Sequence, residues 1–347
     1  MKKITKLLIF IIVVLVLVLA NINIGDKDKN TNKKDKLNVK EVKNKTIENA
    51  ELTLLGSEEM TIVKNGVYEE YGAKAIVNKK DKSKDIKIKG KIDTSKVGEQ
   101  NITYQYGNKK VTRKVNIIEV TDLDTDGIPV LMYHYFYDDT AGESGSNSNY
   151  MRKSSFEQQL KYLSENNYYF PSMKELNLYL DGKIELPSKS VILTLDDGEE
   201  SNYRIAYPLA VQYKVPLYWF VVTSWTDTSM EYQQELKNTG YINYLSHTDS
   251  LHHGGCGEQH GGALLCVNHD EGVKDLKLSI EKLGNADALA YPCGDSNDNA
   301  ISIVREAGFN LAFTTAYGKA SRGLEKLALP RVRMNDGISL DSFIGSL

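Results

Sequence analysis

The feature that most limits the possible folds is a regular alternation of short apolar runs with amphipathic segments from about residue 128 onward. The runs have the length and composition of buried strands, and the segments between them carry apolar residues at helical spacing. A chain in which strands and helices alternate forms a parallel sheet through helical crossovers. More than six such units in about 220 residues predict an α/β domain over residues 127–347. Its expected fold is a (β/α) barrel, incomplete and seven-stranded.

The individual elements follow from the apolar runs and from helix start signals. Ser154 and Glu157 have the spacing of a capping box, which predicts a helix that begins there. The expected strands are 129–133, 191–195, 217–222, 242–245, 288–291 and 311–313, and the expected helices are 154–163, 204–213, 273–283 and 300–307.

Candidate catalytic residues come directly after several of these strands. The C-terminal ends of parallel strands meet on one face of a barrel, so residues that follow them are expected to converge. Turn residues without a function would fall at both ends of the strands. The candidates placed in this way are His134, Asp196, Asp197, His247 and the Pro-Cys-Gly turn at 292–294.

These residue types fit metal-assisted hydrolysis. One carboxylate, from Asp196 or Asp197, and the two imidazoles of His247 and His252 form a three-ligand site for a divalent metal with open positions for water. The second carboxylate beside it can serve as a base. Either piece alone is weak evidence, because Asp-Asp-Gly is often only a turn and a lone histidine pair is more often solvated. The placement at strand ends is what favours an active site.

The N-terminus predicts export. Three lysines in the first six residues precede an apolar run at 7–20, which is the pattern of a secretory signal. The run is short for a membrane-spanning helix, although Ile22 and Ile24 can extend it, and 18–20 is acceptable for cleavage. Residues 1–25 are therefore either a membrane anchor or a cleaved signal. No cysteine lies nearby, which argues against a lipoprotein. We expect the remainder outside the cytoplasm, membrane-anchored or secreted, and associated with the cell wall.

A linker and a second domain are expected before the barrel. Residues 26–50 are rich in Lys, Asp and Asn, and this composition predicts a disordered linker. Residues 51–120 contain short alternating runs separated by turn residues, which predict a small β-sandwich. Segments 68–75 and 92–98 resemble the bacterial Ig-like modules of surface proteins. That resemblance implies spacing or wall attachment rather than chemistry. The expected strands are 61–63, 73–77, 86–89, 101–106 and 111–118.

Composition limits the partners and the role of the cysteines. The net charge of the 347-residue chain is −3 and no basic stripe occurs, so nucleic acid is not an expected partner. We expect a monomer. The three cysteines do not form a disulfide framework. Cys256 and Cys266 can form one bridge or, with His260 and His269, a small zinc site, but the spacing matches no standard zinc motif. The alternative is a Gly-rich loop that contains two thiols.

The Thr-Leu-Asp-Asp-Gly segment at 194–198 resembles the first motif of the polysaccharide deacetylase family, which is built on the chitooligosaccharide deacetylase homology domain. The resemblance covers about residues 128–347 and implies that Asp196 is the base and Asp197 a metal ligand. His247 resembles the first histidine of the second motif, with His252 as the second ligand and His253 as the fallback. The longer histidine spacing and segment 129–134 are similar to the branch that deacetylates poly-N-acetylglucosamine of biofilms.

Two departures from the family pattern affect the expected mechanism. The stretch 290–294 lacks the Arg that usually precedes Pro-Tyr-Gly and has Cys in place of Tyr, so Arg331 is a candidate replacement for the base-orienting Arg. The late Leu-x-x-His that commonly supplies the general acid is also absent. In the poly-N-acetylglucosamine branch the acid comes from the early Tyr-His motif, here His134. The alternative for His134 is a packed histidine at a strand end.

The resemblance implies hydrolysis of N-acetyl groups on N-acetylglucosamine polymers, either peptidoglycan or exported poly-N-acetylglucosamine. The implied cofactor is a divalent metal, Zn²⁺ by default with Co²⁺ or Ni²⁺ as alternatives, which lowers the pKa of a bound water. Asp196 would take the proton of the water and His134 would protonate the leaving amine. The Cys293 N–H would add an oxyanion donor. Two other functions remain open: an acetyl-xylan-type esterase and a catalytically silent wall-binding protein.

Aromatic residues near the strand ends are candidate platforms for sugar rings, although such residues are as often part of the core. These candidates are Tyr135, Trp219, Trp225 and Tyr291.

Overall fold

The computed structural model describes residues 50–225, 236, 239–257 and 261–347. The predicted signal or anchor at 1–25 and nearly all of the predicted linker at 26–50 lie outside these residues. Within the described part of the chain, no helix is both long and apolar enough to cross a membrane.

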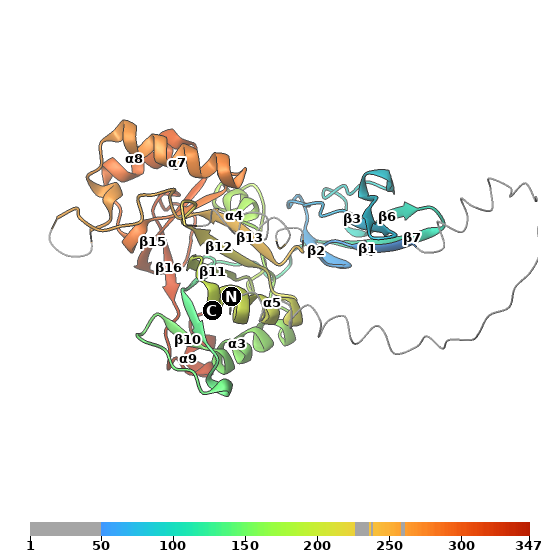
Figure 1. Cartoon of the computed structure of the whole chain (residues 1–347), viewed down its shortest axis with the longest axis horizontal. Helices are drawn as coiled ribbons and strands as arrows, with labels where there is room; N and C mark the ends of the chain where they lie inside the picture. Colours follow the sequence, from blue (N-terminus) through green and yellow to red (C-terminus); the bar gives the residue numbers. More distant parts are fainter. Residues whose placement is uncertain (1–49, 226–235, 237–238, 258–260) are drawn as a thin grey trace, which may run out of the picture. The chain divides into compact units, whose positions relative to one another are not determined.

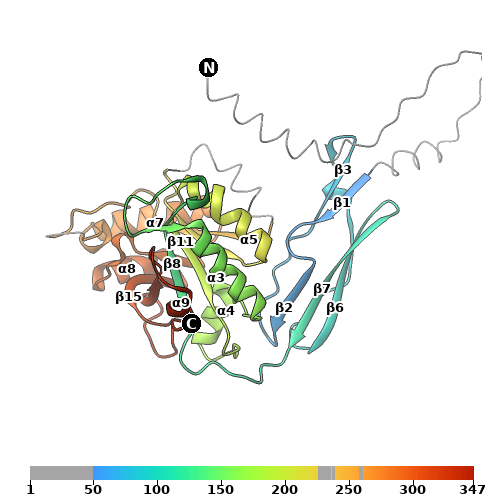
Figure 2. The same ribbon diagram turned by 90° about the horizontal axis from the view of Figure 1, so that it is seen from below.

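The N-terminal described residues form two sheets, with strand orders β1-β3-β4 and β2-β7-β6-β5. Leu52 and Ala73 from the first sheet pack with Ile102 and Tyr104 from the second, so the sheets share one core. Figure 2 shows β6 and β7 as a long neighbouring pair, and they pair antiparallel. The strands are β1 (Ala50–Leu54), β2 (Glu59–Val63), β3 (Ala73–Val77), β4 (Lys80–Asp81), β5 (Lys87–Lys89), β6 (Gly98–Tyr106) and β7 (Lys109–Ile118).

A charged side chain lies inside this β-sandwich. Arg113 is fully buried, and its guanidinium contacts the Glu70 carboxylate at 2.5 Å and the Tyr104 hydroxyl at 3.0 Å. The same guanidinium donates to the Ser57 carbonyl at 3.0 Å. A buried charge is tolerated when it is paired and hydrogen-bonded in this way.

The second part of the chain is the predicted seven-stranded (β/α) barrel, one strand short of the common eight-stranded form. The strands are all parallel and follow the order β11-β12-β13-β14-β15-β16-β8, and β8 closes the ring by pairing with both β16 and β11. The strands are β8 (Val130–Tyr133), β11 (Ile192–Asp197), β12 (Leu217–Val221), β13 (Ile242–Ser246), β14 (Ala288–Ala290), β15 (Leu311–Tyr317) and β16 (Leu329–Arg333).

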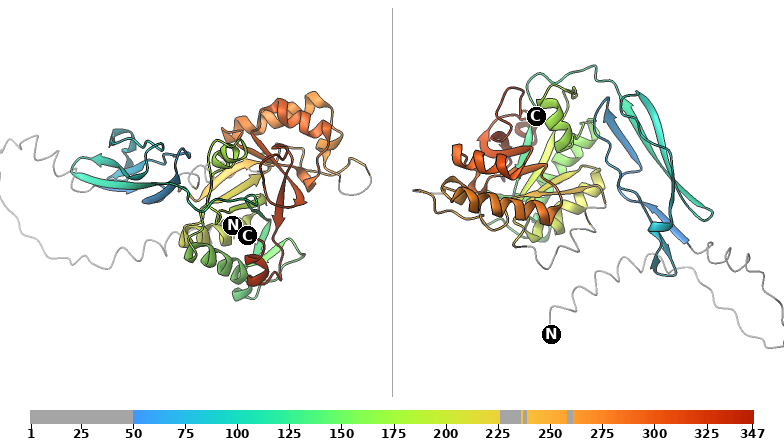
Figure 3. Two further views of the ribbon diagram at one scale, coloured as in Figure 1. Left: turned by 180° about the vertical axis from the view of Figure 1, so that it is seen from behind. Right: turned by 90° about the horizontal axis from the view of Figure 1, so that it is seen from above.

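Helices surround the ring of strands (Figures 1 and 3). They are α3 (Lys153–Glu165), α4 (Met173–Leu180), the π-helical turn Asn202–Ala206 with α5 (Tyr207–Tyr213), α7 (His269–Leu283), α8 (Asp298–Ala307) and α9 (Leu340–Ile344). A further strand pair, β9 (Tyr135–Tyr137) with β10 (Tyr150–Arg152), follows β8.

The alternation of side chains along the strands separates two cores. Ile192 belongs to the cluster that fills the barrel together with Phe220 and Phe313. Leu193 and Leu195 point the other way, into the cluster that includes Leu160 of α3. By this parity Thr194 and Asp196 face the barrel interior, which leads toward the mouth at the C-terminal strand ends.

Several local predictions need correction. The expected capping box at Ser154 is wrong: α3 begins at Lys153 after Arg152, and the Ser154 hydroxyl instead donates to Asp139. The capping box belongs to α4, where Ser172 and Glu175 cap each other reciprocally. The strands β1, β4, β9, β10 and β16 and the helices α4 and α9 were not predicted. They are short, and β16 contains Pro330, which usually argues against a central strand.

Candidate functional site

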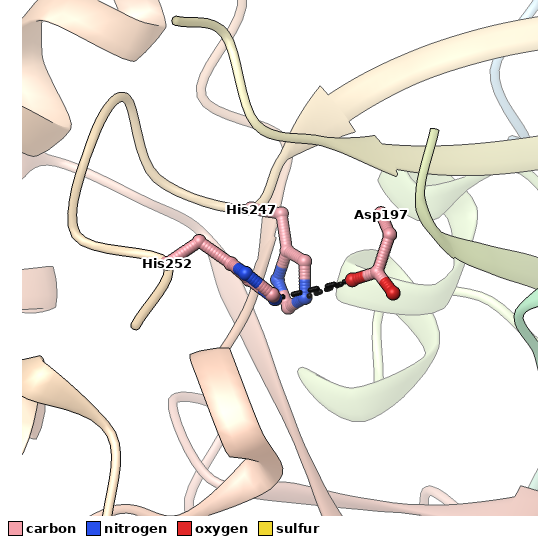
Figure 4. A group of neighbouring side chains, drawn as sticks. All are labelled: Asp197, His247 and His252. Atoms are coloured by element: carbon pink, nitrogen blue, oxygen red, sulfur yellow. Dashed lines mark ion pairs between the residues drawn. The ribbon is translucent and has the colours of Figure 1, made fainter. Parts of the chain in front are cut away.

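Three ligand-type side chains meet at the mouth of the barrel. The Asp197 Oδ1 atom lies 3.1 Å from the His252 Nε2 atom and 3.4 Å from the His247 Nε2 atom (Figure 4). One donor atom from each residue lies within 4.8 Å of the others. Two imidazole nitrogens and one carboxylate oxygen are a donor set that divalent zinc and its neighbours prefer. The residues therefore fit a divalent metal.

The backbone at Asp197 explains how two successive carboxylates face one site. Strand alternation alone would send Asp196 and Asp197 to opposite faces of β11. Asp197 has φ 73°, in the left-handed region, which ends the pleat and turns its side chain toward the histidines. Thr248 and Cys293, at the ends of β13 and β14, also have positive φ, 74° and 61°. Such conformations concentrate at functional sites, where the surrounding fold holds them.

His247 is oriented by a backbone carbonyl. Its Nδ1 atom lies 2.7 Å from the Ala290 oxygen, which can only accept, so this nitrogen carries the hydrogen. In the neutral ring the Nε2 lone pair then faces Asp197 and is available to a metal. Burial lowers the pKa of His247. The hydrogen bond to Asp197 and the charges of Asp196 and Asp197 have a larger, opposite effect, so the pKa lies above its ordinary value.

The electrostatics of Asp197 also favour a cation at this position. Burial alone would raise its pKa, but the hydrogen bonds to His247 and His252 hold the pKa of the carboxyl far below its usual range. The carboxylate therefore stays ionised under all ordinary conditions. An ionised carboxylate facing two imidazole nitrogens attracts positive charge, either as protons on the rings or as a bound metal ion.

The structure places His252, and not His253, in the cluster. His253 is exposed, its Nδ1 atom lies 2.7 Å from the Gly254 oxygen, and it belongs to no metal-ligand group among the described residues. The loop between the two ligands is anchored to α7. The Asp275 carboxylate accepts hydrogen bonds of 2.9 Å from the N–H groups of both Asp249 and Ser250.

Asp196 lies beside the metal ligands and pairs with Arg331. The guanidinium donates from Nη1 to Oδ1 at 2.8 Å and from Nη2 to Oδ2 at 2.7 Å. Both side chains are buried, and Arg331 also donates to the Thr314 carbonyl and the Thr194 hydroxyl. An Arg that replaces the missing base-orienting Arg would have to contact the Asp196 carboxylate, and Arg331 does so. Burial raises the pKa of Asp196, but the charge and hydrogen bonds of Arg331 outweigh it, so the pKa is lowered.

His134 follows β8 directly and lies at the same mouth. It continues the interior parity of Val130 and Met132 and is partly buried. Burial lowers the pKa of His134, and the charges of Asp196 and Asp197 only partly offset this effect, so the net pKa is lowered. The position on the catalytic face fits the expected acid, and the lowered pKa means a small protonated fraction at neutral pH.

The turn after β14 places Cys293 at the site and removes Tyr291 from it. Cys293 is the exposed free cysteine, and it lies in a 3-10 turn, Pro292–Gly294, close enough to Asp197 for its charge to act on the thiol. The turn requires glycine at 294, where φ is 83° and an added Cβ would lie 2.1 Å from Thr315. Tyr291 as a substrate residue is wrong: it is 1% exposed and its hydroxyl donates to the Leu327 carbonyl.

Of the other aromatic candidates for sugar binding, one is buried in the core and two lie beside the metal-ligand cluster. Trp219 is fully buried, so it cannot be a sugar platform. Trp225 is 60% exposed, and its ring lies 5.0 Å from the ring of His252. The Tyr135 ring is partly buried and its hydroxyl donates to Asp197.

The cysteines do not form a second zinc site. Cys256 and Cys266 are joined as a disulfide, so neither thiol is available as a ligand. His260 lies outside the described residues. His269 begins α7, partly exposed, and its Nε2 atom contacts the Ser302 hydroxyl at 3.2 Å. The single-bridge alternative is therefore the one that the structure contains.

Comparison with known proteins gives the fold and the site a family context. The family model described as polysaccharide deacetylase matches residues 183–312, and the one described as bacterial surface protein, Ig-like domain, matches residues 52–120. The chain contains a polysaccharide deacetylase domain. An Ig-like domain precedes it in the sequence. The deacetylase match includes Asp196, Asp197, His247 and His252, whereas His134 and Arg331 lie outside it.

Several named deacetylases are similar to this chain. The poly-β-1,6-N-acetyl-D-glucosamine N-deacetylase of Staphylococcus aureus is 28% identical over 198 residues, covering 53% of this chain and 67% of the relative. The deacetylase PplD of Streptococcus pyogenes, solved with acetate, is 26% identical, with a TM-score of 0.55 over 64% of this chain and 99% of that one. IcaB of Ammonifex degensii is 28% identical, with a TM-score of 0.53 over 65% and 97%.

Proposed function

We propose that the chain is a metal-dependent N-deacetylase that removes acetyl groups from N-acetylglucosamine residues of an extracytoplasmic polysaccharide. The observation that carries the proposal is the Asp197–His247–His252 cluster beside an Arg331-paired Asp196 at the barrel mouth. The names of the relatives favour poly-β-1,6-N-acetylglucosamine as the polymer. Peptidoglycan is the second candidate, because it is the nearest such polymer for an enzyme held at the cell surface.

Each residue has a task in amide hydrolysis. Asp197, His247 and His252 would hold the divalent ion, with Zn²⁺ as the default for this donor set. When bound, such an ion acidifies a water and stabilises negative charge on the acetyl oxygen. Asp196, kept ionised by Arg331, accepts the proton of the attacking water. The Cys293 N–H donates to the developing oxyanion, and His134 gives a proton to the leaving amine. Trp225 supplies an exposed ring beside the site for stacking on a sugar.

The location is proposed from the sequence. The lysines and the apolar run at 1–20 favour an exported protein, either anchored or released after cleavage. Fractionation of cells should find the chain in the membrane or the medium. A cytoplasmic pool of chains that retain residues 1–20 contradicts this proposal.

The deciding experiment measures acetate release by the purified chain from poly-N-acetylglucosamine and from peptidoglycan. We expect release that a chelator abolishes and added Zn²⁺ restores, and no release by Asp196→Asn. Release unaffected by metal removal contradicts the assigned mechanism. Acetylated xylan serves as the third substrate, because preferred release from it identifies an esterase. Absence of release from all three by the zinc-loaded chain supports a silent wall-binding protein.

A further inference from the structure

Tyr135 contacts a proposed metal ligand from outside the barrel. It lies in β9, directly after His134, and its hydroxyl donates to the Oδ2 atom of Asp197. The other oxygen of the same carboxylate, Oδ1, is the atom that faces the two histidines. The two oxygens of Asp197 therefore have different partners. One is held by a protein donor, and the other is directed at the site of the metal.

The different partners of the two Asp197 oxygens affect how the carboxylate can coordinate a metal. A carboxylate can bind a metal through one oxygen or through both. Oδ2 already accepts the Tyr135 hydroxyl, so a metal that bound both oxygens would have to share Oδ2 with this donor, and the Asp197 side chain is only 10% exposed. The hydrogen bond therefore favours a one-oxygen ligand. It leaves coordination positions for a water and an acetyl oxygen.

A second ligand is oriented in a comparable way. His247 is fixed by the Ala290 carbonyl, which acts on the ring nitrogen that faces away from the metal site. Outer partners of this kind fix ligand orientation and raise metal affinity. The Tyr135 hydroxyl acts in this way on the Asp197 carboxylate.

The fold gives Tyr135 a fixed position. Its N–H donates to the Asn149 carbonyl at 3.2 Å, and β9 pairs in parallel with β10 so that Tyr135 lies opposite Tyr150. The two rings are 5.0 Å apart. The next residue, Phe136, donates its N–H to the Ser201 hydroxyl at 3.0 Å, which fastens β9 to the segment that follows β11. The Tyr135 hydroxyl thus has a defined direction toward Asp197.

We infer that Tyr135 is a positioning residue that holds Asp197 as a one-oxygen metal ligand, and not a sugar platform. The inference rests on the proposed metal site, which belongs to the proposed function. It assigns to the β9–β10 pair a role in metal retention, carried by a residue outside the part of the chain that the deacetylase family model matches.

The test compares Tyr135→Phe with Tyr150→Phe in the full chain. Each substitution removes one hydroxyl and keeps the ring, but of the two hydroxyls it is that of Tyr135 that donates to a proposed metal ligand. Zinc affinity is measured without substrate, by competition with a chromogenic chelator. We expect Tyr135→Phe to bind zinc about 10–100-fold more weakly than the unchanged chain. Tyr150→Phe should bind zinc like the unchanged chain. Excess zinc should restore much of the kcat of Tyr135→Phe with little change in KM.

The possible outcomes distinguish a failure of the Tyr135 inference from a failure of the proposed metal site or of the proposed function. Zinc affinity of Tyr135→Phe equal to or greater than that of the unchanged chain overturns the inference alone. A raised KM with normal zinc affinity in Tyr135→Leu would assign the ring to substrate binding instead. If the unchanged chain binds no zinc, the proposed metal site fails and the inference fails with it. If the unchanged chain binds zinc but releases no acetate, the proposed function fails while the zinc comparison still decides the role of Tyr135.

Discussion

Arg331 and Asp196 form a buried, bidentate ion pair in the barrel although they are 135 residues apart in the sequence. Asp196 is the next-to-last residue of β11 and Arg331 lies in β16, and β8 lies between these strands in the ring. The guanidinium therefore reaches the carboxylate through the barrel interior. A buried carboxylate without such a partner would resist ionisation, and an un-ionised Asp196 cannot serve as a base.

Arg331→Met should destabilise the barrel. It leaves the Asp196 charge buried without a partner, which costs about 3–5 kcal/mol in the free energy of unfolding. Arg305→Met is the control, because the Arg305–Glu325 pair is exposed on both sides and such pairs contribute about 0–1 kcal/mol. Chemical denaturation of both variants checks the difference. Equal losses would contradict the importance of the buried pair.

The same Arg331→Met variant should change the pH dependence of activity. In the unchanged chain the pKa of Asp196 lies below its ordinary 3.8, so the base stays ionised and the acidic limb lies at low pH. Without Arg331 burial dominates and raises this pKa, so the acidic limb of kcat/KM should move to higher pH. Measurements on folded variant protein test this shift. An unmoved limb would mean that Asp196 is not the base.

His252→Ala and His253→Ala should differ in metal content. Of these two histidines, His252 has its Nε2 atom 3.1 Å from Asp197, whereas His253 contacts the Gly254 carbonyl. We expect His252→Ala to lose zinc and activity together and His253→Ala to keep both. Metal analysis of the purified variants decides the matter. The reverse pattern would place the ligand at His253.

His134→Ala should spare zinc binding and slow deacetylation by about 10²–10⁴-fold, as expected for loss of a general acid. Burial lowers the pKa of His134, so the alkaline limb that depends on it should lie at or below the ordinary 6.5 and disappear in the variant. An acetanilide-type substrate with a better leaving group should lose less rate. His269→Ala, outside the site, is the control. Near-normal activity of His134→Ala on sugar amides would make His134 structural.

The sequence predicted the barrel and the convergence of its candidate residues because strand ends in a parallel barrel share one face. It could not predict how Asp196 and Asp197 come to serve one site, since that depends on the positive φ of Asp197, which the residue type permits but does not require. Arg331 was a candidate only through the family resemblance. Its strand contains Pro330, and an ion pair between distant strands has no local signal.

Tyr135 shows a second limit of sequence reasoning. An aromatic residue after a strand was expected to be either a sugar platform or part of the core. The hydrogen bond to Asp197 depends on the pairing of β9 with β10, and each of these strands has only 3 residues. Strands this short carry no periodic pattern that a sequence could show. The burial of Trp219 and Tyr291 likewise follows from the parity of β12 and from the turn after β14, and not from their identity.

The Ig-like domain offers a prediction about pH and stability that does not depend on catalysis. Glu70 is the charged partner of the buried Arg113, and it also accepts hydrogen bonds from Tyr68 and Tyr104. Burial opposes its ionisation, but the hydrogen bonds and the charge of Arg113 outweigh burial, and the pKa of Glu70 is lowered from 4.5. A lowered folded-state pKa means that this stability is complete above the unfolded-state pKa and is lost as the pH falls through the folded-state pKa.

Glu70→Gln should therefore destabilise the domain at neutral pH by about 1.5–3 kcal/mol, the range for hydrogen bonds to charged groups. The difference from the unchanged chain should persist at pH 7, begin to shrink below about pH 4.5, and vanish once the pH has fallen below the lowered folded-state pKa of Glu70, where both proteins lack the negative charge. Hydrogen-exchange protection of β6 and β7 in the full chain, corrected for intrinsic exchange, measures this difference. Glu99→Gln is the control, because Glu99 lies in β6, one of the strands measured, but is exposed, and its carboxylate lies 3.8 Å from the Lys114 ammonium. A loss of protection in Glu70→Gln that is the same at both pH values would mean that the Glu70 side chain acts through packing and not through its charge.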